Sequence, residues 1–323
     1  MSKLLVLSER DVQRLLDMES CVEAMTEVLT SLARGELYQP LRFVSRPPDA
    51  SNLIGLMPAY RGGASPAWAL KEIVVTPDNP TRGLDAHQGG VLLHDGTTGE
   101  LVALLNASPI TAIRTAAVSA VATRALARAD AKRVAIIGAG VQARSHVDAM
   151  RVALDDPEIR IYARRNDAAE TLASEVGALA SPSPDAALFG VEVVCTTTSS
   201  REPVLEHRWL APGAHVNAVG SSIPTARELD TETMSKASLF VDRRESTLNE
   251  AGDYLIPAAE GVFGPEHIKA ELGEVLAGLA PGRTDEEELT VFKSLGIAVE
   301  DLAAADLLVS RARELGVGTE VEF

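Results

Sequence analysis

Apolar residues recur along this chain with two different spacings, and the change from one spacing to the other separates its segments. Residues 1–40 follow helical spacing, and Ser8 is the expected N-cap residue of this helical region. The helical spacing predicts a buried stripe made of Leu15, Met18, Val22, Met25 and Leu29.

Residues 41–106 have a strand-like pattern instead. Runs at 43–45, 69–76 and 91–94 are separated by proline, glycine and Asp-Gly signals. Residues 95–99 predict a hairpin turn before a further strand at 101–105. The first part of the chain is therefore expected to be a mainly antiparallel sheet with helices.

A helix rich in small residues is expected at 109–129, and strands then alternate with helices. This alternation predicts a parallel sheet with helices on both faces. A last helix is expected at 297–315. The predicted fold class is α/β, with a Rossmann-type domain at 116–299 and an α+β domain formed by 1–115 with 300–323. The strand candidates of the Rossmann-type domain are 134–137, 159–163, 191–196, 215–219 and 239–242.

Composition agrees with a globular enzyme of two domains, because 323 residues with 46% hydrophobic content exceed what one core commonly holds. No apolar stretch is long enough for a membrane helix, and the apolar run at the N-terminus is too short for a signal peptide. The net charge of −16 argues against nucleic acid as a partner. The two cysteines, Cys21 and Cys195, give no disulfide framework, and we expect a cytoplasmic protein without a metal site.

The strongest motif follows the apolar run at 134–137. Gly138, Gly140 and Ala143 form the G-x-G-x-x-A pattern between an expected strand and an expected helix. The first glycine permits a sharp turn, the second lets the backbone approach a pyrophosphate, and the small third residue lets helix and strand pack closely. This context predicts a dinucleotide bound at a helix N-terminus.

The end of the next strand indicates which dinucleotide is bound. An acid at this place binds the ribose of NAD, whereas arginine accommodates the 2′-phosphate of NADP. Here Ala163 stands near the acid position, and Arg164 and Arg165 follow it. NADPH is the favoured coenzyme, while Asp167 leaves NADH open as an alternative.

Three cations stand in apolar or small-residue surroundings, namely Arg42 on an expected strand, Lys71 in another, and Arg114 in the small-residue helix. Burying such a charge is costly unless it meets a counter-charge. A substrate carboxylate is one such partner, since arginine binds it in a bidentate fork. Ordinary ion pairs with protein acids, or long side chains that reach solvent, remain open as alternatives.

Several ordered segments resemble the ornithine cyclodeaminase/mu-crystallin family, most closely its mu-crystallin (ketimine reductase) branch. The resemblance runs over nearly the whole chain. The segments that carry it are 55–60 (GLMPAY), 111–120 (TAIRTAAVSA), 137–143 (IGAGVQA), 216–220 (VNAVG), 227–230 (RELD), 271–275 (ELGEV) and 290–296 (TVFKSLG).

The resemblance implies a homodimer formed through the β-rich domain, with the active site between the two domains of each subunit. Arg42, Lys71 and Arg114 match positions that contact the substrate, and Met57 and His87 match pocket residues. The positions that match coenzyme contacts are Thr115, Gly138, Ala139, Gly140, Val141, Gln142, Arg164, Arg165, Thr196, Thr197, Val219 and Leu295.

One position departs from part of the family. Cyclodeaminases and archaeal alanine dehydrogenases carry an acid/base aspartate where this chain has Ser222. Serine is a poor base for removing protons from an ammonium group, whereas reduction of a protonated imine needs no such base. Ser222 therefore weighs against cyclodeaminase activity and leaves a weak polar contact beside the substrate nitrogen.

The leading hypothesis is an NAD(P)H-dependent reductase that converts ketimine carboxylates, such as Δ1-pyrroline-2-carboxylate or Δ1-piperideine-2-carboxylate, to the L-amino acid. In this hypothesis Arg42 and Arg114 clamp the carboxylate, and Lys71 supplies a proton. The first alternative is an ornithine cyclodeaminase or an NAD-dependent amino-acid dehydrogenase. The second is an NADPH-dependent small-molecule-binding protein without turnover.

Overall fold

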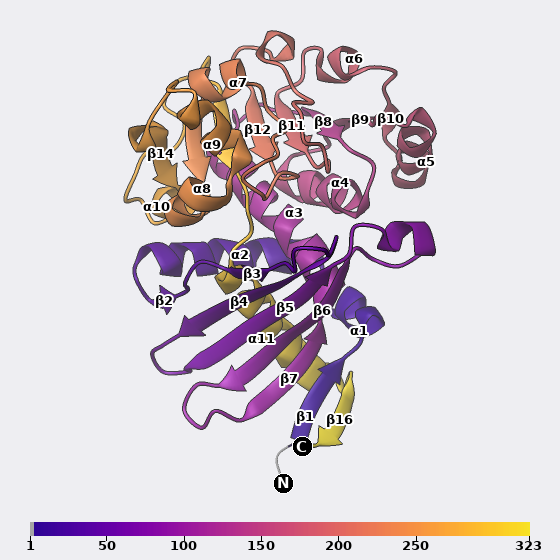
Figure 1. The fold of residues 1–323 in the computed structure, drawn as a ribbon, viewed down its shortest axis with the longest axis vertical. Coiled ribbons are helices and arrows are strands. Elements are labelled where there is room, and N and C mark those ends of the chain that lie inside the picture. The colour runs from indigo at the N-terminus through magenta and orange to yellow at the C-terminus, as the bar shows by residue number, and fades with distance from the viewer. Residues whose placement is uncertain (1–2) are drawn as a thin grey trace. The chain divides into compact units, whose positions relative to one another are not determined.

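The computed structural model describes residues 3–323, which form two compact units. Unit 1 comprises the chain up to Arg114 together with Ile297–Phe323, and unit 2 is Thr115–Gly296. The predicted α/β class is confirmed, because one unit contains a parallel Rossmann-type sheet and the other an α+β arrangement (Figure 1). The substrate and coenzyme roles given to the two sequence ranges stay predictions.

Unit 1 is built on one mixed sheet with the strand order β16-β1-β7-β6-β5-β4-β2, and β3 also pairs with β4. Neighbouring strands are antiparallel except β1 and β7, which run parallel. The strands are β1 (Lys3–Leu7), β2 (Leu37–Tyr38), β3 (Phe43–Ser45), β4 (Leu53–Arg61), β5 (Ala67–Val75), β6 (His87–Asp95), β7 (Leu101–Asn106) and β16 (Thr319–Glu322).

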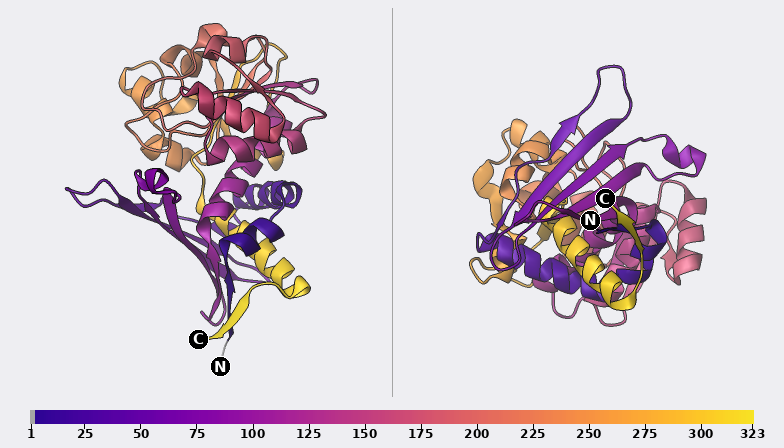
Figure 2. Two further views of the ribbon diagram at one scale, coloured as in Figure 1. Left: turned by 90° about the vertical axis from the view of Figure 1, so that its right-hand side faces the viewer. Right: turned by 90° about the horizontal axis from the view of Figure 1, so that it is seen from below.

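Helices α2 (Met18–Ala33) and α11 (Ala298–Leu315) pack together, and Figure 2 shows both on one face of this sheet. Side chains of the strands alternate between the two faces. Those facing the helices are buried, whereas the opposite face is only partly covered within the described part of unit 1. The remaining elements of the unit are α1 (Glu9–Leu15) and the short 3-10 helix η1 (Asn79–Arg82).

The expected helical region at 1–40 is wrong at its beginning. Lys3–Leu7 is strand β1, and it pairs with both β7 and β16. Tertiary pairing overrides the local pattern here, because this pairing places Leu4, Leu5 and Leu7 in the core. Helix α1 does begin after Ser8, whose side chain and Asp11 form a reciprocal capping box. The predicted stripe is buried except at Met18, which is partly exposed.

Unit 2 is an all-parallel sheet with the strand order β10-β9-β8-β11-β12-β15-β13-β14. The order reverses between β8 and β11, which is the switch point where doubly wound sheets bind their ligands. The strands are β8 (Arg133–Ile137), β9 (Glu158–Tyr162), β10 (Leu179–Ala180), β11 (Val193–Thr196), β12 (His215–Ala218), β13 (Ser238–Val241), β14 (Ile268–Glu271) and β15 (Thr290–Lys293).

Strand β15 was not among the expected strands, although all four of its residues are buried. Thr290 and Lys293 make its pattern too polar to suggest a central strand. The helices of the unit are α4 (Val141–Ala153), α5 (Asn166–Val176), α6 (Pro184–Leu188), α7 (Thr231–Lys236), α8 (Arg244–Glu250), α9 (Gly252–Ala259) and α10 (Leu272–Leu276), while α3 (Ala107–Leu126) contains the boundary between the units. Within residues 3–323, no helix has the length and apolar character needed to cross a membrane.

Candidate active site

The glycine-rich turn of unit 2 connects β8 to α4. Gly138 has a φ of 132°, and a Cβ there would lie 2.5 Å from Thr197 Oγ1, so this position requires glycine. A Cβ on Gly140 would meet no described atom within 4 Å, and no described side chain caps α4 at this residue. The turn thus leaves room in front of a helix N-terminus, which fits the pyrophosphate of a dinucleotide.

His146 holds the first turn of α4 in place. Its Nδ1 lies 2.7 Å from the carbonyl oxygen of Gln142, and its Nε2 lies 2.9 Å from Ser119 Oγ. Burial lowers the pKa of His146 to about 4, so the ring is neutral at physiological pH. A neutral ring that donates from Nδ1 accepts at Nε2, which links α4 to α3 one turn beyond Thr115.

Strand β9 ends at Tyr162, so Ala163 does occupy the place where an NAD-binding acid would follow the strand. Arg164 and Arg165 are exposed beside it, and Arg165 is the N-cap residue of α5. Asp167 is also exposed, in the first turn of α5. Two exposed guanidinium groups next to the expected ribose position suit a 2′-phosphate.

The remaining coenzyme candidates of unit 2 gather at the carboxyl ends of its central strands. Thr196 ends β11 and Thr197 follows it, Val219 follows β12, and Leu295 follows β15. Thr197 Oγ1 donates to the carbonyl oxygen of Ile137 at 3.1 Å, which joins this edge to the glycine turn. Ser222 is exposed in the loop after β12. The parallel sheet therefore brings to one edge residues that are far apart in the sequence.

Lys71 and Arg114 of unit 1 belong to a buried ionic cluster. Lys71 lies on β5 with its backbone between Met57 of β4 and Val91 of β6. Its Nζ is 2.8 Å from Asp301 Oδ2, and both side chains are 1% exposed. Buried charges of this kind require close counter-charges, which Asp301 provides to Lys71.

Arg114 belongs to the same cluster. Its Nε donates to Asp301 Oδ1 at 3.2 Å, and its Nη1 donates to Glu300 Oε2 at 2.7 Å. The ion-pair alternative of the sequence analysis thus applies to Lys71 and Arg114. A guanidinium carries five N–H donors, so pairing with protein acids and binding of a carboxylate are compatible.

The pKa of Lys71 is lowered from 10.5 to about 8. Burial is the main cause, and the positive charges of Arg114 and Arg42 act in the same direction. The negative charge of Asp301 opposes the shift. Lys71 is therefore a cation at neutral pH that can release its proton more readily than an ordinary lysine.

Arg42 and His87 lie at the border of this cluster. Arg42 directly precedes β3 instead of lying on the expected strand, because the pairing of β3 with β4 begins at Phe43. His87 begins β6 and keeps an exposed surface, yet partial desolvation lowers the pKa of its ring, and the charges of Lys71 and Arg114 add to this effect. The lowered pKa favours the uncharged ring of His87 near these cations.

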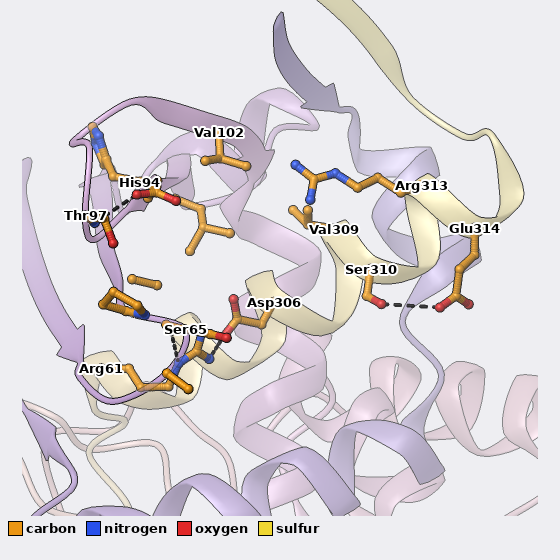
Figure 3. A pocket seen from close by; sticks show the side chains of 15 residues that line it. Arg61, Ser65, His94, Thr97, Val102, Asp306, Val309, Ser310, Arg313 and Glu314 are labelled. Atoms are coloured by element: carbon orange, nitrogen blue, oxygen red, sulfur yellow. Dashed lines mark hydrogen bonds and ion pairs between the residues drawn. The ribbon is translucent and has the colours of Figure 1, made fainter. Parts of the chain in front are cut away.

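A separate hollow of about 640 Å³ lies on unit 1 near the start of β5 and the second half of α11 (Figure 3). Arg61 and Asp306 form an ion pair in its wall, and Ser310 Oγ donates to Glu314. None of the predicted site residues lines it. This hollow therefore does not coincide with the buried cluster of Lys71 and Arg114.

The acids Glu300 and Asp301 were not among the site residues predicted from the sequence. Acidic residues at the start of a helix are commonly explained by the helix dipole, and both stand in the first turn of α11. In the structure both acids are fully buried, and a buried acid needs a cation beside it. Lys293, Asp253 and Glu228 form a second buried group that was also missed.

Known proteins resemble the chain over almost its whole length. The ketimine reductase mu-crystallin of Mus musculus is 42% identical over 276 residues, which is 85% of each chain. A solved structure of Thermococcus litoralis Δ1-pyrroline-2-carboxylate reductase with NADH and L-proline superimposes with a TM-score of 0.94, at 38% identity over 98% of this chain and 100% of the other.

An archaeal alanine dehydrogenase dimer with bound NAD also gives a TM-score of 0.94, at 32% identity over the full length of both chains. The family model described as ornithine cyclodeaminase/mu-crystallin family matches residues 2–316. The predicted resemblance is thereby confirmed, and the chain belongs to the ornithine cyclodeaminase/mu-crystallin family.

Proposed function

We propose that this protein is an NAD(P)H-dependent reductase of ketimine carboxylates, with Δ1-pyrroline-2-carboxylate and Δ1-piperideine-2-carboxylate as candidate substrates and the L-amino acid as product. The observation that carries the proposal is the buried cluster of Lys71 and Arg114 with Asp301 and Glu300, in a chain that also contains a Rossmann-type unit. Two similar proteins are a ketimine reductase and a Δ1-pyrroline-2-carboxylate reductase with NADH and L-proline, which supports this chemistry.

The charges of the cluster suit an anionic substrate. Lys71 and Arg114 pair with Asp301 and Glu300, and the positive charge of Arg42 also acts on Lys71. A guanidinium carries five N–H donors, so Arg42 and Arg114 can bind a substrate carboxylate in addition to their protein partners. Arg42 and Arg114 then hold the carboxylate and fix the orientation of the imine carbon.

Lys71 is suited to supply the proton. With a pKa of about 8 it is mostly protonated at neutral pH, and its proton is more easily given to an imine nitrogen than that of an ordinary lysine. Asp301 keeps the ammonium group in place through the 2.8 Å contact. The bound nicotinamide coenzyme supplies the hydride for the imine carbon.

Unit 2 would hold the coenzyme. The open turn at Gly138–Gly140 and the N-terminus of α4 fit the pyrophosphate, and Arg164 with Arg165 favour NADPH over NADH. The further proposed contacts are Thr115, Ala139, Val141, Gln142, Thr196, Thr197, Val219 and Leu295. The coenzymes bound in the similar solved structures are NADH and NAD, so NADH is expected to serve as well.

We assign the outer face of the unit 1 sheet to a homodimer. Trp68 and Leu104 are 42% and 36% exposed there, and Tyr60 packs against Trp68 with ring centroids 4.6 Å apart. An apolar sheet face of this kind marks an interaction site, and a similar protein is an alanine dehydrogenase dimer. Sedimentation should give about twice the 34.1 kDa of one chain, and a monomer that is fully active would contradict the assignment.

A cytoplasmic location agrees with the cysteines. Cys21 and Cys195 are buried free thiols, and burial raises the pKa of each to about 12. Such thiols are unreactive and fit a reducing compartment.

The test is a panel of cyclic and N-methylated ketimine carboxylates, each assayed with NADPH and with NADH, alongside L-ornithine. We expect reduction of at least one ketimine, a preference for NADPH, and negligible ammonia release from L-ornithine because Ser222 is a poor base. Ammonia release faster than ketimine reduction would instead establish a cyclodeaminase. Coenzyme binding without turnover of any substrate would establish a binding protein.

A further inference from the structure

The carboxyl edge of the unit 2 sheet contains a buried carboxylate, Glu228, that does not itself line the proposed coenzyme site. Glu228 is 0% exposed and lies in the loop between β12 and α7. Its Oε1 accepts from the backbone N–H and the hydroxyl of Thr198, at 2.6 and 2.7 Å. Its Oε2 accepts from Thr196 Oγ1 at 2.8 Å and from the backbone N–H of Gly220 at 2.7 Å.

These four hydrogen bonds connect the end of β11 with the end of β12. Thr196 and Thr198 stand on either side of Thr197, and Gly220 follows Val219, so both segments contain proposed coenzyme contacts. The approach is close, since a Cβ on Gly220 would lie 2.5 Å from Glu228 Oε1 and 2.1 Å from the carbonyl oxygen of Thr198. Only glycine permits this distance.

Glu228 is held by a second layer of buried charges. Asp253 Oδ1 accepts from the backbone N–H groups of Glu228 and Leu229, at 2.8 and 2.9 Å. Asp253 Oδ2 pairs with Lys293 Nζ at 2.9 Å, and Lys293 also donates to the carbonyl oxygen of Ala218 at 3.1 Å. The network therefore includes the end of β15, directly before Leu295.

We infer that Glu228 is a positioning residue for reduction, one that fixes the Thr196–Thr198 and Val219–Gly220 segments against the coenzyme. Strands β11 and β12 lie on the side of β8 opposite β9, whose end is the proposed adenine-ribose position, so these segments face the nicotinamide half. The inference rests on the coenzyme site proposed above. A carboxylate is required because each of its oxygens faces a backbone N–H, which can only donate; the amide of glutamine would turn its NH₂ group toward one of these N–H groups. Without the hydrogen bonds to Glu228, β11 and β12 stay paired, but the Thr196–Thr198 and Val219–Gly220 segments can move.

The amino ends of the strands in the same sheet contain a residue, Glu192, that serves as a matched control for Glu228. Glu192 precedes β11, and its Oε2 accepts from the backbone N–H groups of Lys132 and Arg133 at 3.0 and 2.7 Å. It thus joins two strand beginnings in the way that Glu228 joins two strand ends. A substitution at Glu192 also removes carboxylate bonds to backbone, but at the edge away from the glycine turn.

The experiment compares Glu228→Gln with Glu192→Gln in the full-length protein. Binding of the whole coenzyme is measured by calorimetry beside binding of ADP-ribose or its 2′-phosphate, which lack the nicotinamide. For Glu228→Gln we expect coenzyme affinity to fall at least 10-fold, fragment affinity to stay within twofold, and kcat to fall about 100-fold. Glu192→Gln should lower the melting temperature without changing the ratio of the two affinities.

Two further measurements keep the inference falsifiable. With coenzyme deuterated at the nicotinamide C4, the isotope effect on kcat should rise in Glu228→Gln, because poorer alignment makes the chemical step slower. If Glu228→Gln does not fold, Thr198→Val removes one donor with little change of shape and should show the same changes at a smaller size. Equal loss of coenzyme and fragment affinity, or an isotope effect unchanged from wild type, would overturn the inference.

The outcome can be separated from that of the proposed function. Failure of wild-type protein to reduce any ketimine would refute the proposed reaction. The difference between whole-coenzyme and fragment binding would still decide whether Glu228 positions the nicotinamide half.

Discussion

Each unit of this protein buries one lysine–aspartate ion pair, and the two pairs have nearly the same geometry. Lys71 Nζ lies 2.8 Å from Asp301 in unit 1, and Lys293 Nζ lies 2.9 Å from Asp253 in unit 2. All four side chains are at most 1% exposed. Burial and contact distance alone therefore do not distinguish a reactive lysine from a structural one.

The neighbours of the two lysines do distinguish them. Lys71 shares Asp301 with Arg114, and the surrounding positive charge helps to lower its pKa to about 8. Lys293 instead contacts a carbonyl oxygen. Burial raises the pKa of nearby Glu228, and the positive charge of Lys293 opposes that rise. Neighbouring cations lower the pKa of a lysine and so ease the loss of its proton. A lysine surrounded by acceptors instead connects the strands that carry them.

Replacing each lysine by methionine should show the largest difference between the two ion pairs. Lys71→Met should lower kcat/KM for ketimine reduction by about 10³-fold, because the proton donor is lost. Lys293→Met should instead lower the free energy of unfolding by about 3–5 kcal/mol, because Asp253 keeps a buried charge without its cation. Steady-state kinetics and urea unfolding of both variants provide the measurement, and a Lys71→Met enzyme with wild-type activity would refute the assignment.

Arg42 tests whether the cluster binds a carboxylate. Arg42→Ala should lower kcat/KM by about 10- to 100-fold, mainly through KM for the ketimine, because a charge-assisted hydrogen bond is lost. NADPH affinity should stay within twofold. Arg46 is exposed just after β3, so Arg46→Ala is the control and should change neither constant. An unchanged KM in Arg42→Ala would remove this residue from the carboxylate site.

The pH dependence should reveal the lowered pKa of Lys71. Protonated Lys71 is the donor for reduction, so kcat/KM should fall about 10-fold per pH unit above about pH 8. Oxidation of the L-amino acid needs the neutral amine and should rise over the same range. An N-methylated iminium substrate needs no proton at nitrogen and should weaken the decline; an identical decline would limit Lys71 to a role in binding.

Much of the fold could be predicted because its signals are local. The turn at Gly138, the cap at Ser8 and the alternating strands of both sheets depend on residues close together in the sequence. The short strand Lys3–Leu7 could not be predicted, because its two partners lie about 100 and 300 residues away. Local periodicity does not contain that information.

The candidate site also has one part that local sequence signals predict and one part that depends on distant residues. Lys71 and Arg114 stand out in the sequence as charges among apolar or small residues. Their acids lie on α11, and Asp301 is 187 positions after Arg114 in the sequence. Nothing in the sequence around Asp301 distinguishes it from an acid that stabilises a helix N-terminus. The charge balance of the cluster, and with it the pKa of Lys71, therefore required the structure.

The pH profile of Asp301→Asn, measured beside wild type and Asp253→Asn, tests the central claim most directly. The negative charge of Asp301 raises the pKa of Lys71 toward its ordinary value, so its removal should move the alkaline decline of kcat/KM from about pH 8 to about pH 7 or lower. Asp253→Asn should reduce stability and leave the decline near pH 8. A decline that stays near pH 8 in Asp301→Asn would contradict the assignment of Lys71 as the proton donor of this site.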